Sequence, residues 1–131
     1  MNTKGYKDLI VYQKAFNLAM KIFNISKRFP KEERYSLTDQ IRRSSRSVAT
    51  CIAESYRKRN YEAYFVSKLS DADMENSETQ VWLDFSLACE YVDHNEKNEL
   101  EGISEEVGKM LKSMMESPQK FLTVKYNRQT L

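Results

Sequence analysis

The stretch from Ser36 to Asn60 constrains the fold most strongly, because small and apolar side chains recur in it at the spacing of a packed helix. Steps of three or four residues keep side chains on one face of an α-helix, which forms a seam against neighbouring helices. This seam consists of Leu37, Ile41, Ser45, Val48, Ile52 and Ser55 or Tyr56. Ser36 is the expected N-cap, and Asp39 favours the positive end of the helix dipole.

Three further long helices are predicted. The first runs from a cap at Asp8 to about Phe29, the third from a cap at Asn60 to about Tyr91 or Val92, and the fourth from about Glu96 to Glu116. Only three Gly and two Pro occur in 131 residues, so few breaks interrupt these helices. The sequence predicts an all-α, antiparallel up-and-down four-helix bundle. We expect a single domain over residues 1–131, with its core at about 6–116 and a tail, mobile or docked, at 117–131.

The apolar patterns of the other helices differ in width. The first helix has two adjacent seams, Leu9, Tyr12, Phe16, Ala19 and Phe23 beside Val11, Ala15, Leu18, Ile22 and Ile25. Two seams are more than one core-facing stripe requires, so this helix is expected to lie centrally or to contact another subunit. The third seam is Phe65, Leu69, Ala72, Asn76, Thr79 and Leu83, and the fourth is Leu100, Ile103, Val107, Met110 and Met114. Asn76 and Thr79 are polar positions that could fix the register.

Charge is distributed unevenly along the chain, although the net charge is only +2. Residues 1–35 carry +5, residues 36–70 carry +4, residues 71–106 carry −11 and residues 107–131 carry +4. Such blocks indicate self-association or an anionic partner for the basic face. Mutual neutralisation of the blocks within the bundle is the alternative.

A basic cluster on the second predicted helix is the candidate functional site. It consists of Arg42, Arg43, Arg46, Arg57, Lys58 and Arg59. Cations at repeated spacing bind phosphates, and Tyr56 and Tyr61 beside them could stack on unpaired bases. The structural alternatives are helix pairs with Glu54, the dipole at the helix C-terminus, and ion pairs with Asp71, Asp73 or Glu75 on the next helix or subunit.

Signals of catalysis, cofactors and membrane insertion are nearly absent from the sequence. The single histidine, His94, falls in a predicted turn, and no metal-binding, phosphate-loop or nucleophile motif occurs, so no cofactor is expected. The acids Asp71, Glu75 and Glu78 read as a solvated face, and Cys51 and Cys89 as reduced structural thiols. No apolar run reaches the roughly 20 residues of a membrane span, and the N-terminus lacks a signal-peptide core, so we expect a cytoplasmic location.

Several of these segments resemble the four-helix-bundle family encoded within intervening sequences of bacterial 23S rRNA genes. The resemblance lies in KDLIVYQKA at residues 7–15, in the connector with Phe29-Pro30, Glu33 and Leu37, and above all in Gln40-Ile41-Arg42-Arg43, Ser47-Val48 and Ile52-Ala53-Glu54. Cys51 and Ser55 stand where the family usually has Asn and Gly. The resemblance implies a homopentameric ring without known catalytic chemistry. A related branch, accessory proteins of diversity-generating retroelements, binds nucleic acid and a reverse transcriptase.

Two functional hypotheses follow. The first is a non-enzymatic homo-oligomer, pentameric by resemblance, that binds structured RNA or DNA through the cluster Arg42–Arg59. The second is an assembly or adaptor protein that scaffolds a protein partner, such as a reverse transcriptase, with its arginines in subunit contacts.

Overall fold

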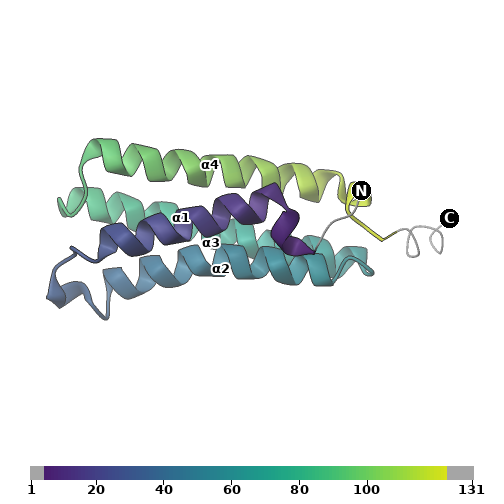
Figure 1. The fold of residues 1–131 in the computed structure, drawn as a ribbon, viewed down its shortest axis with the longest axis horizontal. Coiled ribbons are helices and arrows are strands. Elements are labelled where there is room, and N and C mark those ends of the chain that lie inside the picture. Colours follow the sequence, from purple (N-terminus) through teal and green to yellow (C-terminus); the bar gives the residue numbers. More distant parts are fainter. Residues whose placement is uncertain (1–4, 124–131) are drawn as a thin grey trace.

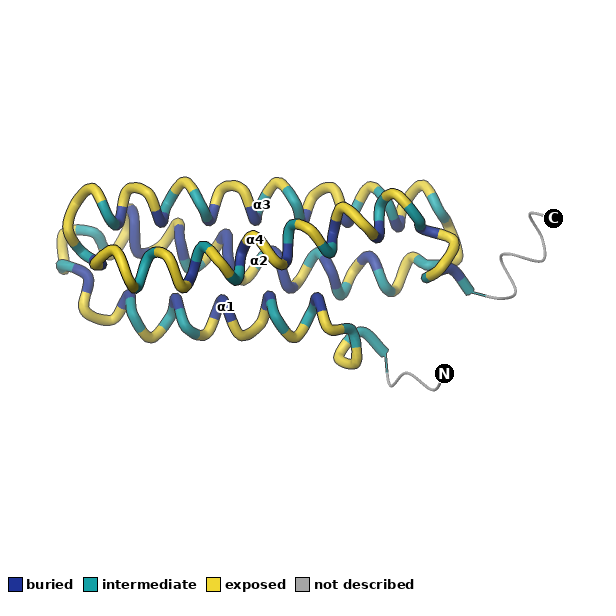
Figure 2. Tube along the Cα trace, turned by 90° about the horizontal axis from the view of Figure 1, so that it is seen from above, coloured by how far each residue is buried: buried dark blue, intermediate teal, exposed yellow. Residues whose placement is uncertain are grey.

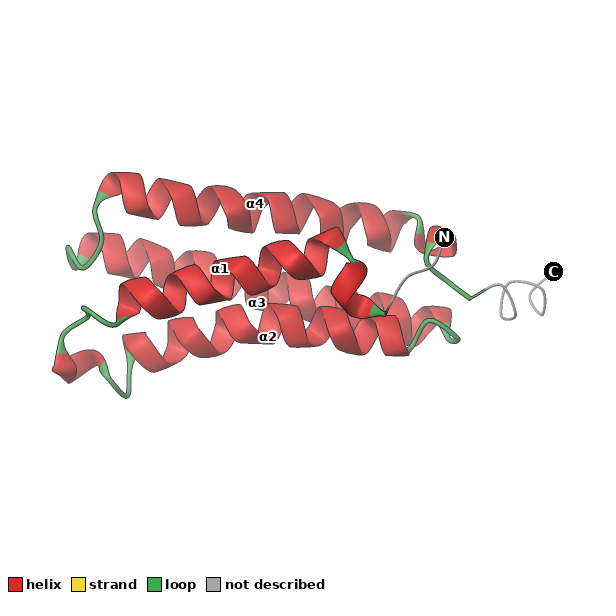
Figure 3. Cartoon of the chain, in the orientation of Figure 1, coloured by secondary structure: helices red, strands yellow, loops and turns green. Residues whose placement is uncertain are grey.

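The computed structural model describes residues 5–123, and these form four long helices (Figure 1). The helices are α1 (Ile10–Ser26), α2 (Leu37–Arg57), α3 (Glu62–Ala88) and α4 (His94–Glu116). Single 3-10 turns lie at Tyr6–Asp8, Lys31–Glu33 and Pro118–Lys120. The described part of the chain contains no strand, and consecutive helices alternate in direction (Figure 3). The predicted antiparallel four-helix bundle is confirmed.

The helices are arranged in a square in which chain neighbours are also spatial neighbours. Helix α2 packs between α1 and α3, and α4 closes the bundle against α3 and α1. Helices α2 and α4 therefore lie on opposite corners (Figure 1). Short connections favour this antiparallel order, because a helix that ends in a tight turn returns beside its predecessor.

The core runs along the bundle axis, where the buried positions of all four helices meet (Figure 2). It consists of two clusters. One is centred on Val48, Ile52, Phe65, Leu69, Val107 and Leu111, and the other on Leu18, Ile22, Ile41, Leu83 and Leu100. Each of these side chains contributes about 1.5–3 kcal/mol by leaving water. The three-and-four spacing that defined the helices thus also defines the core.

The two seams of α1 differ in how far they are buried. The seam with Val11, Ala15, Leu18 and Ile22 is buried in the core. In the other seam Ala19 is buried, Tyr12 and Phe23 are half-buried, and Phe16 is 52% exposed. Helix α1 is therefore not central, and part of its second seam forms an apolar surface.

The α4 seam differs from the prediction at two positions. Its buried residues are Leu100, Ser104, Val107, Leu111 and Met114, whereas Ile103 and Met110 are half-buried. Ser104 takes the inner position because α3 supplies polar partners for it. The Nδ2 of Asn76 donates to the Ser104 carbonyl at 2.9 Å, and the Ser104 hydroxyl donates to Asn76 Oδ1 at 2.8 Å. Reading apolar residues alone misses such a satisfied polar pair.

The α3 seam is confirmed at all six positions, including the buried Asn76 and Thr79. The Thr79 hydroxyl lies 2.9 Å from that of Ser44 on α2. Asn76 and Thr79 therefore connect α3 to opposite neighbours, α4 and α2, through hydrogen bonds in the core. Such bonds are satisfied in only one register of the helices.

The predicted cap of the first helix is wrong, and that of the second helix is right in position but does not make the capping hydrogen bond. Asp8 lies in a 3-10 turn, and α1 begins at Ile10 after Leu9. Ser36 occupies the cap position of α2, but its hydroxyl donates to Glu33 Oε1 at 2.6 Å, and that carboxylate accepts from the Leu37 amide at 3.3 Å. The longer Glu side chain thus takes over the capping role.

The Glu33 carboxylate also links the connection between α1 and α2 to the connection between α3 and α4. Its Oε2 accepts a hydrogen bond from the Tyr91 hydroxyl at 2.8 Å. The hydrogen bonds from Ser36 and Tyr91, and then the Leu37 amide, hold the pKa of Glu33 below its usual value. The hydrogen bond between the Tyr91 hydroxyl and Glu33 raises the pKa of Tyr91 to about 12.

The remaining boundaries also shift. Tyr61 is the N-cap of α3, and the Oδ1 of Asn60 instead accepts a hydrogen bond from Thr123 at 3.0 Å. Helix α1 ends at Ser26 and α3 at Ala88, each about three residues earlier than predicted. Helix α4 begins two residues early, at His94, because Asp93 and Glu96 form a reciprocal capping box.

The described start of the tail is docked on the bundle. Phe121 stacks on Phe65 with ring centres 6.2 Å apart, and Leu122 joins the first core cluster. Of the two predicted forms of the tail, a mobile arm or a docked extension, residues 117–123 take the docked form. Residues 124–131 lie outside the described residues.

Candidate nucleic-acid interface

Helix α2 separates its apolar and cationic residues onto opposite faces. Ile41, Val48 and Ile52 are buried, whereas Arg43, Arg46 and Arg57 are exposed. At about 100° per residue, these arginines fall within a strip pointing away from the core. The six predicted cations, called the basic strip below, are Arg42, Arg43, Arg46, Arg57, Lys58 and Arg59. The outward position of Arg43, Arg46 and Arg57 follows from the helix period, whereas Arg42 and Arg59 are half-buried. Lys58 and Arg59 follow the last residue of α2.

The first three arginines of the basic strip differ in how firmly they are held. The Nε of Arg42 donates to the Ser26 hydroxyl at 2.8 Å, and its guanidinium lies 4.8 Å from the centre of the Phe23 ring. Arg46 lies 5.5 Å from the same ring and remains exposed. Arg42 therefore joins α2 to α1, while Arg43 and Arg46 extend into solvent.

The three cations at the end of α2 lie among tyrosines. Arg59 stacks on Tyr56 at 3.6 Å from the ring centre, and its Nε donates to the Tyr56 carbonyl at 3.0 Å. The Nζ of Lys58 lies 5.5 Å from the centre of the Tyr64 ring. Tyr61 is 57% exposed, so its ring remains accessible. Of the two predicted stacking residues, Tyr56 is thus partly covered by a neighbouring arginine and Tyr61 is open.

The acidic partners expected for the basic strip are absent within the bundle. Among residues 5–123, none of the six cations forms an ion pair within 4.0 Å. Glu54, the expected helix partner of Arg57 and Lys58, lies 3.6 Å from Lys68 instead. Lys68 also lies 3.8 Å from Asp71, one of the expected partners of the arginines. The alternative of pairing within the bundle is therefore not observed among residues 5–123, and Lys68 contacts Glu54 and Asp71 instead. Pairing with another subunit stays a prediction.

Glu75 lies close enough to the basic strip for the charge of Arg43 to act on its pKa. Burial, followed by a hydrogen bond and repulsion from Glu78, raises the pKa of Glu75. Ser47 and the charge of Arg43 act in the opposite direction and only partly compensate. Arg43 thus influences Glu75 without forming a close ion pair with it.

The surface beside the basic strip is hollowed at both ends of α2. At one end lies an open hollow of about 740 Å³, called the basic basin, whose cationic lining is Lys27, Lys31, Arg34, Arg42, Arg43 and Arg46. Asp39 is its one acidic lining residue. At the other end lies a hollow of about 550 Å³, the basic pocket, with Lys7, Arg57 and Arg59 in its lining. The structure therefore divides the predicted cluster into two cationic sites.

Four cations of these hollows were not predicted as site residues. They are Lys7, Lys27, Lys31 and Arg34, from the segments on either side of α1. The +5 charge of residues 1–35 was a signal that cations were available there. Their position beside α2 depends on how α1 packs, which the charge count does not contain.

No metal centre is found in the described part of the chain. Residues 5–123 contain no group of three His, Cys, Asp or Glu side chains placed to hold an ion. His94 is exposed at the first turn of α4. Burial raises the pKa of the Cys51 thiol, and Cys89 is exposed and separate from it. No helix among these residues combines the length and apolar character that crossing a membrane requires.

Comparison with known proteins identifies a family and a solved structure to which this chain is similar. A model of the 23S rRNA-intervening sequence protein family matches residues 7–113, most of the chain. The chain belongs to this family. The chain is also similar to a crystal structure from Bacteroides thetaiotaomicron VPI-5482, with a TM-score of 0.75 and 28% sequence identity. That structure is described as a protein of unknown function from the S23 ribosomal protein family. The similarity covers 82% of this chain and 100% of that one. The comparison with curated proteins gave no match.

Membership in the 23S rRNA-intervening sequence protein family confirms the predicted resemblance, and neither comparison indicates an enzymatic family. The two departures from the family pattern are accommodated structurally. Ser55 is fully buried, and its hydroxyl donates to the Ile52 carbonyl at 2.7 Å. Cys51 is half-buried against the first core cluster. Both substitutions therefore serve the packing of α2.

Proposed function

We propose that this family member is a non-enzymatic, homo-oligomeric bundle that binds structured RNA or DNA through the basic strip. The supporting observation is that the six cations on α2 and just beyond its end lack an ion-pair partner among residues 5–123, and four of them are exposed. Elsewhere in the bundle, Lys14, Lys21 and Lys97 do pair with acids of α3 or α4. Unpaired cations concentrated on one face attract a polyanion, because binding releases its condensed counterions.

The test is fluorescence anisotropy of a labelled RNA hairpin, titrated with the protein across a range of salt concentrations. Each phosphate contact adds about −0.9 to the slope of log affinity against log salt for a duplex. The double charge reversal Arg46→Glu with Arg57→Glu should lower the affinity and reduce the magnitude of the slope by about 2. Both side chains are exposed, so thermal stability should change little.

A matched control uses two exposed lysines on the opposite corner of the bundle. Lys109→Glu with Lys112→Glu on α4 changes the net charge by the same amount. If the basic strip is the site, this control retains most of the affinity. Equal weakening by both pairs would reduce the effect to net charge, and absence of binding at low salt would refute the proposal.

A second candidate function is assembly or scaffolding of a protein partner, and exposed apolar side chains favour it. Helix α3 carries Met74, Val81 and Phe85 on its solvent side, and α1 carries Phe16 and Met20. In this case the arginines of the basic strip would form subunit contacts, so Arg46→Glu with Arg57→Glu would change the mass measured by light scattering. A monomeric mass for the unaltered protein would exclude self-assembly, including the pentamer that the family resemblance implies.

A further inference from the structure

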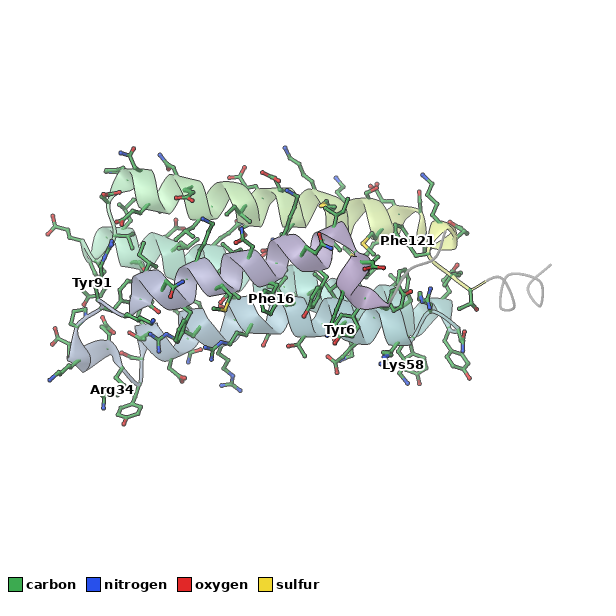
Figure 4. All side chains as sticks on the ribbon, viewed as in Figure 1. Tyr6, Phe16, Arg34, Lys58, Tyr91 and Phe121 are labelled. Atoms are coloured by element: carbon green, nitrogen blue, oxygen red, sulfur yellow. The ribbon has the colours of Figure 1, made fainter. Side chains whose placement is uncertain are left out.

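A third hollow shares lining residues with both the basic basin and the basic pocket. This aromatic groove, of about 410 Å³, runs between α1 and α2. Arg46 and Thr50 line both the basin and the groove, and Tyr6 lines both the groove and the pocket. Figure 4 shows Arg34, Phe16, Tyr6 and Lys58 in this order along the α1–α2 side of the bundle. The three hollows therefore form one row on the surface, called the channel below, with cations at both ends and aromatic rings in the middle.

The middle of this channel is an aromatic ladder. The Tyr6 and Tyr12 rings meet edge-on with centres 5.0 Å apart, and the Tyr12 and Phe16 ring centres are 6.0 Å apart. Phe16 is 52% exposed, and Ala49 and Ala53 of α2 supply small side chains opposite. Small residues leave space above the rings, so flat groups can enter the groove and stack there.

The charges at the two ends identify the chemistry of the occupant. None of the cations that line the basin or the pocket forms an ion pair within residues 5–123. Between Arg43 and Arg57, α2 spans roughly 21 Å at about 1.5 Å per residue. An occupant that suits both ends and the middle carries repeated negative charges and repeated flat apolar faces.

Single-stranded nucleic acid has both properties, whereas a duplex does not. Its bases are free to stack on aromatic side chains while its phosphates follow a basic groove. In a duplex the base faces are already stacked on one another, so an aromatic ladder on the protein gains nothing from them. The aromatic groove can therefore distinguish single-stranded from double-stranded nucleic acid, which the basic strip alone cannot.

We propose that the channel between α1 and α2 binds an unpaired segment of nucleic acid, with its bases on Tyr6, Tyr12 and Phe16 and its phosphates in the basic basin and basic pocket. This inference rests on the function proposed above and specifies the part of the nucleic acid that is recognised. In a structured RNA the segment would be a loop or an end.

The test compares an unstructured, labelled oligonucleotide of about 12 nucleotides with the same sequence annealed to its complement. This length lies within the roughly 4–16 nucleotides that grooves of this kind cover. The single strand should bind more tightly than the duplex at equal salt. Phe16→Ala should weaken single-strand binding about 5- to 100-fold, the effect of removing one stacked base. The salt dependence should stay unchanged, because no phosphate contact is removed.

Three further variants separate stacking from other effects. Phe16→Leu keeps an apolar side chain but removes the ring, so it should weaken binding as well, whereas Phe16→Trp should retain it. Phe85→Ala on α3 is the matched control, because Phe85 is 53% exposed but lies outside the lining of the channel. Molecular mass is measured for each variant in the same buffer.

The outcomes distinguish the two proposals. Tighter binding of the duplex, with no effect of Phe16→Ala, would overturn the channel and leave the basic strip as the site. A change in mass on Phe16→Ala, or equal losses for Phe16→Ala and Phe85→Ala, would assign this face to protein contacts and also overturn the channel. Absence of binding to both strands and duplex at low salt would overturn the proposed function itself.

Discussion

Removing the side chain of Asn76 should destabilise the bundle more than any surface change. Asn76 is buried on α3 and exchanges two hydrogen bonds with Ser104 of α4, at 2.9 and 2.8 Å. The Nε2 of Gln80 donates to the same Ser104 hydroxyl at 2.9 Å. Because no buried side-chain polar atom among residues 5–123 lacks a partner, the network is fully satisfied. Asn76→Ala breaks it at the centre.

The size of the effect follows from the contacts. Two lost hydrogen bonds cost about 1 kcal/mol each, and the small cavity adds to this. The Ser104 hydroxyl keeps the bond from Gln80, which limits the penalty of an orphaned polar group. We therefore expect Asn76→Ala to lower the free energy of unfolding by about 2–3 kcal/mol. At about 3–4 °C per kcal/mol for a chain of this size, the Tm should fall by roughly 6–12 °C.

Urea denaturation followed by far-ultraviolet circular dichroism measures this loss, at one fixed protein concentration because association shifts apparent stability. A double-mutant cycle with Ser104→Ala isolates the pair. We expect the two single changes to be non-additive by about 1–2 kcal/mol, since each removes the same hydrogen bonds. A cost below about 0.5 kcal/mol for Asn76→Ala, or strict additivity, would show that the network contributes little and refute this reasoning.

Three further changes test other parts of the structure. Gly102→Ala should stabilise α4 by up to about 1 kcal/mol, because the added Cβ meets open space. Gly108→Ala should stabilise it less, because the added Cβ would lie 3.3 Å from Asn76 Nδ2. Thermal melts of the two variants compare them directly. Asp93→Ala breaks the α4 capping box and should cost about 1 kcal/mol in urea denaturation, and an unchanged midpoint would contradict this. Because the pKa of Glu33 is lowered in the folded state, its carboxylate stabilises the fold at pH values above its unfolded pKa near 4.5. This contribution is lost as the pH falls through the folded pKa. The Tm difference between the unaltered protein and Glu33→Gln should therefore shrink between about pH 6 and pH 3, and a constant difference would argue against the Glu33 hydrogen bonds as its source.

The sequence alone was sufficient for the helices and most of their inward faces. The α3 seam from Phe65 to Leu83 was predicted at every position, because helical period is a local property that each residue spacing reports directly. The outward position of Arg43, Arg46 and Arg57 follows from the same period, since residues opposite the buried face of α2 must face solvent.

The errors occurred where a residue's role depends on another element. Ser36 looked like a cap by type and position, but Glu33 reaches the Leu37 amide first. The predicted α4 seam did not include Ser104, which is buried because Asn76 of α3 lies opposite it. Glu54 stood at helix-pair distance from Arg57, and yet Lys68 of the next helix took it. Side chains of similar reach compete for a partner, and only the packed arrangement decides which one is nearest.

The candidate site divides in the same way. The sequence by itself determined that Arg43, Arg46 and Arg57 would share one strip of α2, and that α1 would carry more apolar surface than a core requires. Only the tertiary structure decided that the aromatic side of α1 lies along the cations of α2, with Arg34 at one end and Lys7 at the other. Helical period fixes the direction of a side chain about its own axis, whereas the angle at which two helices pack fixes which faces meet.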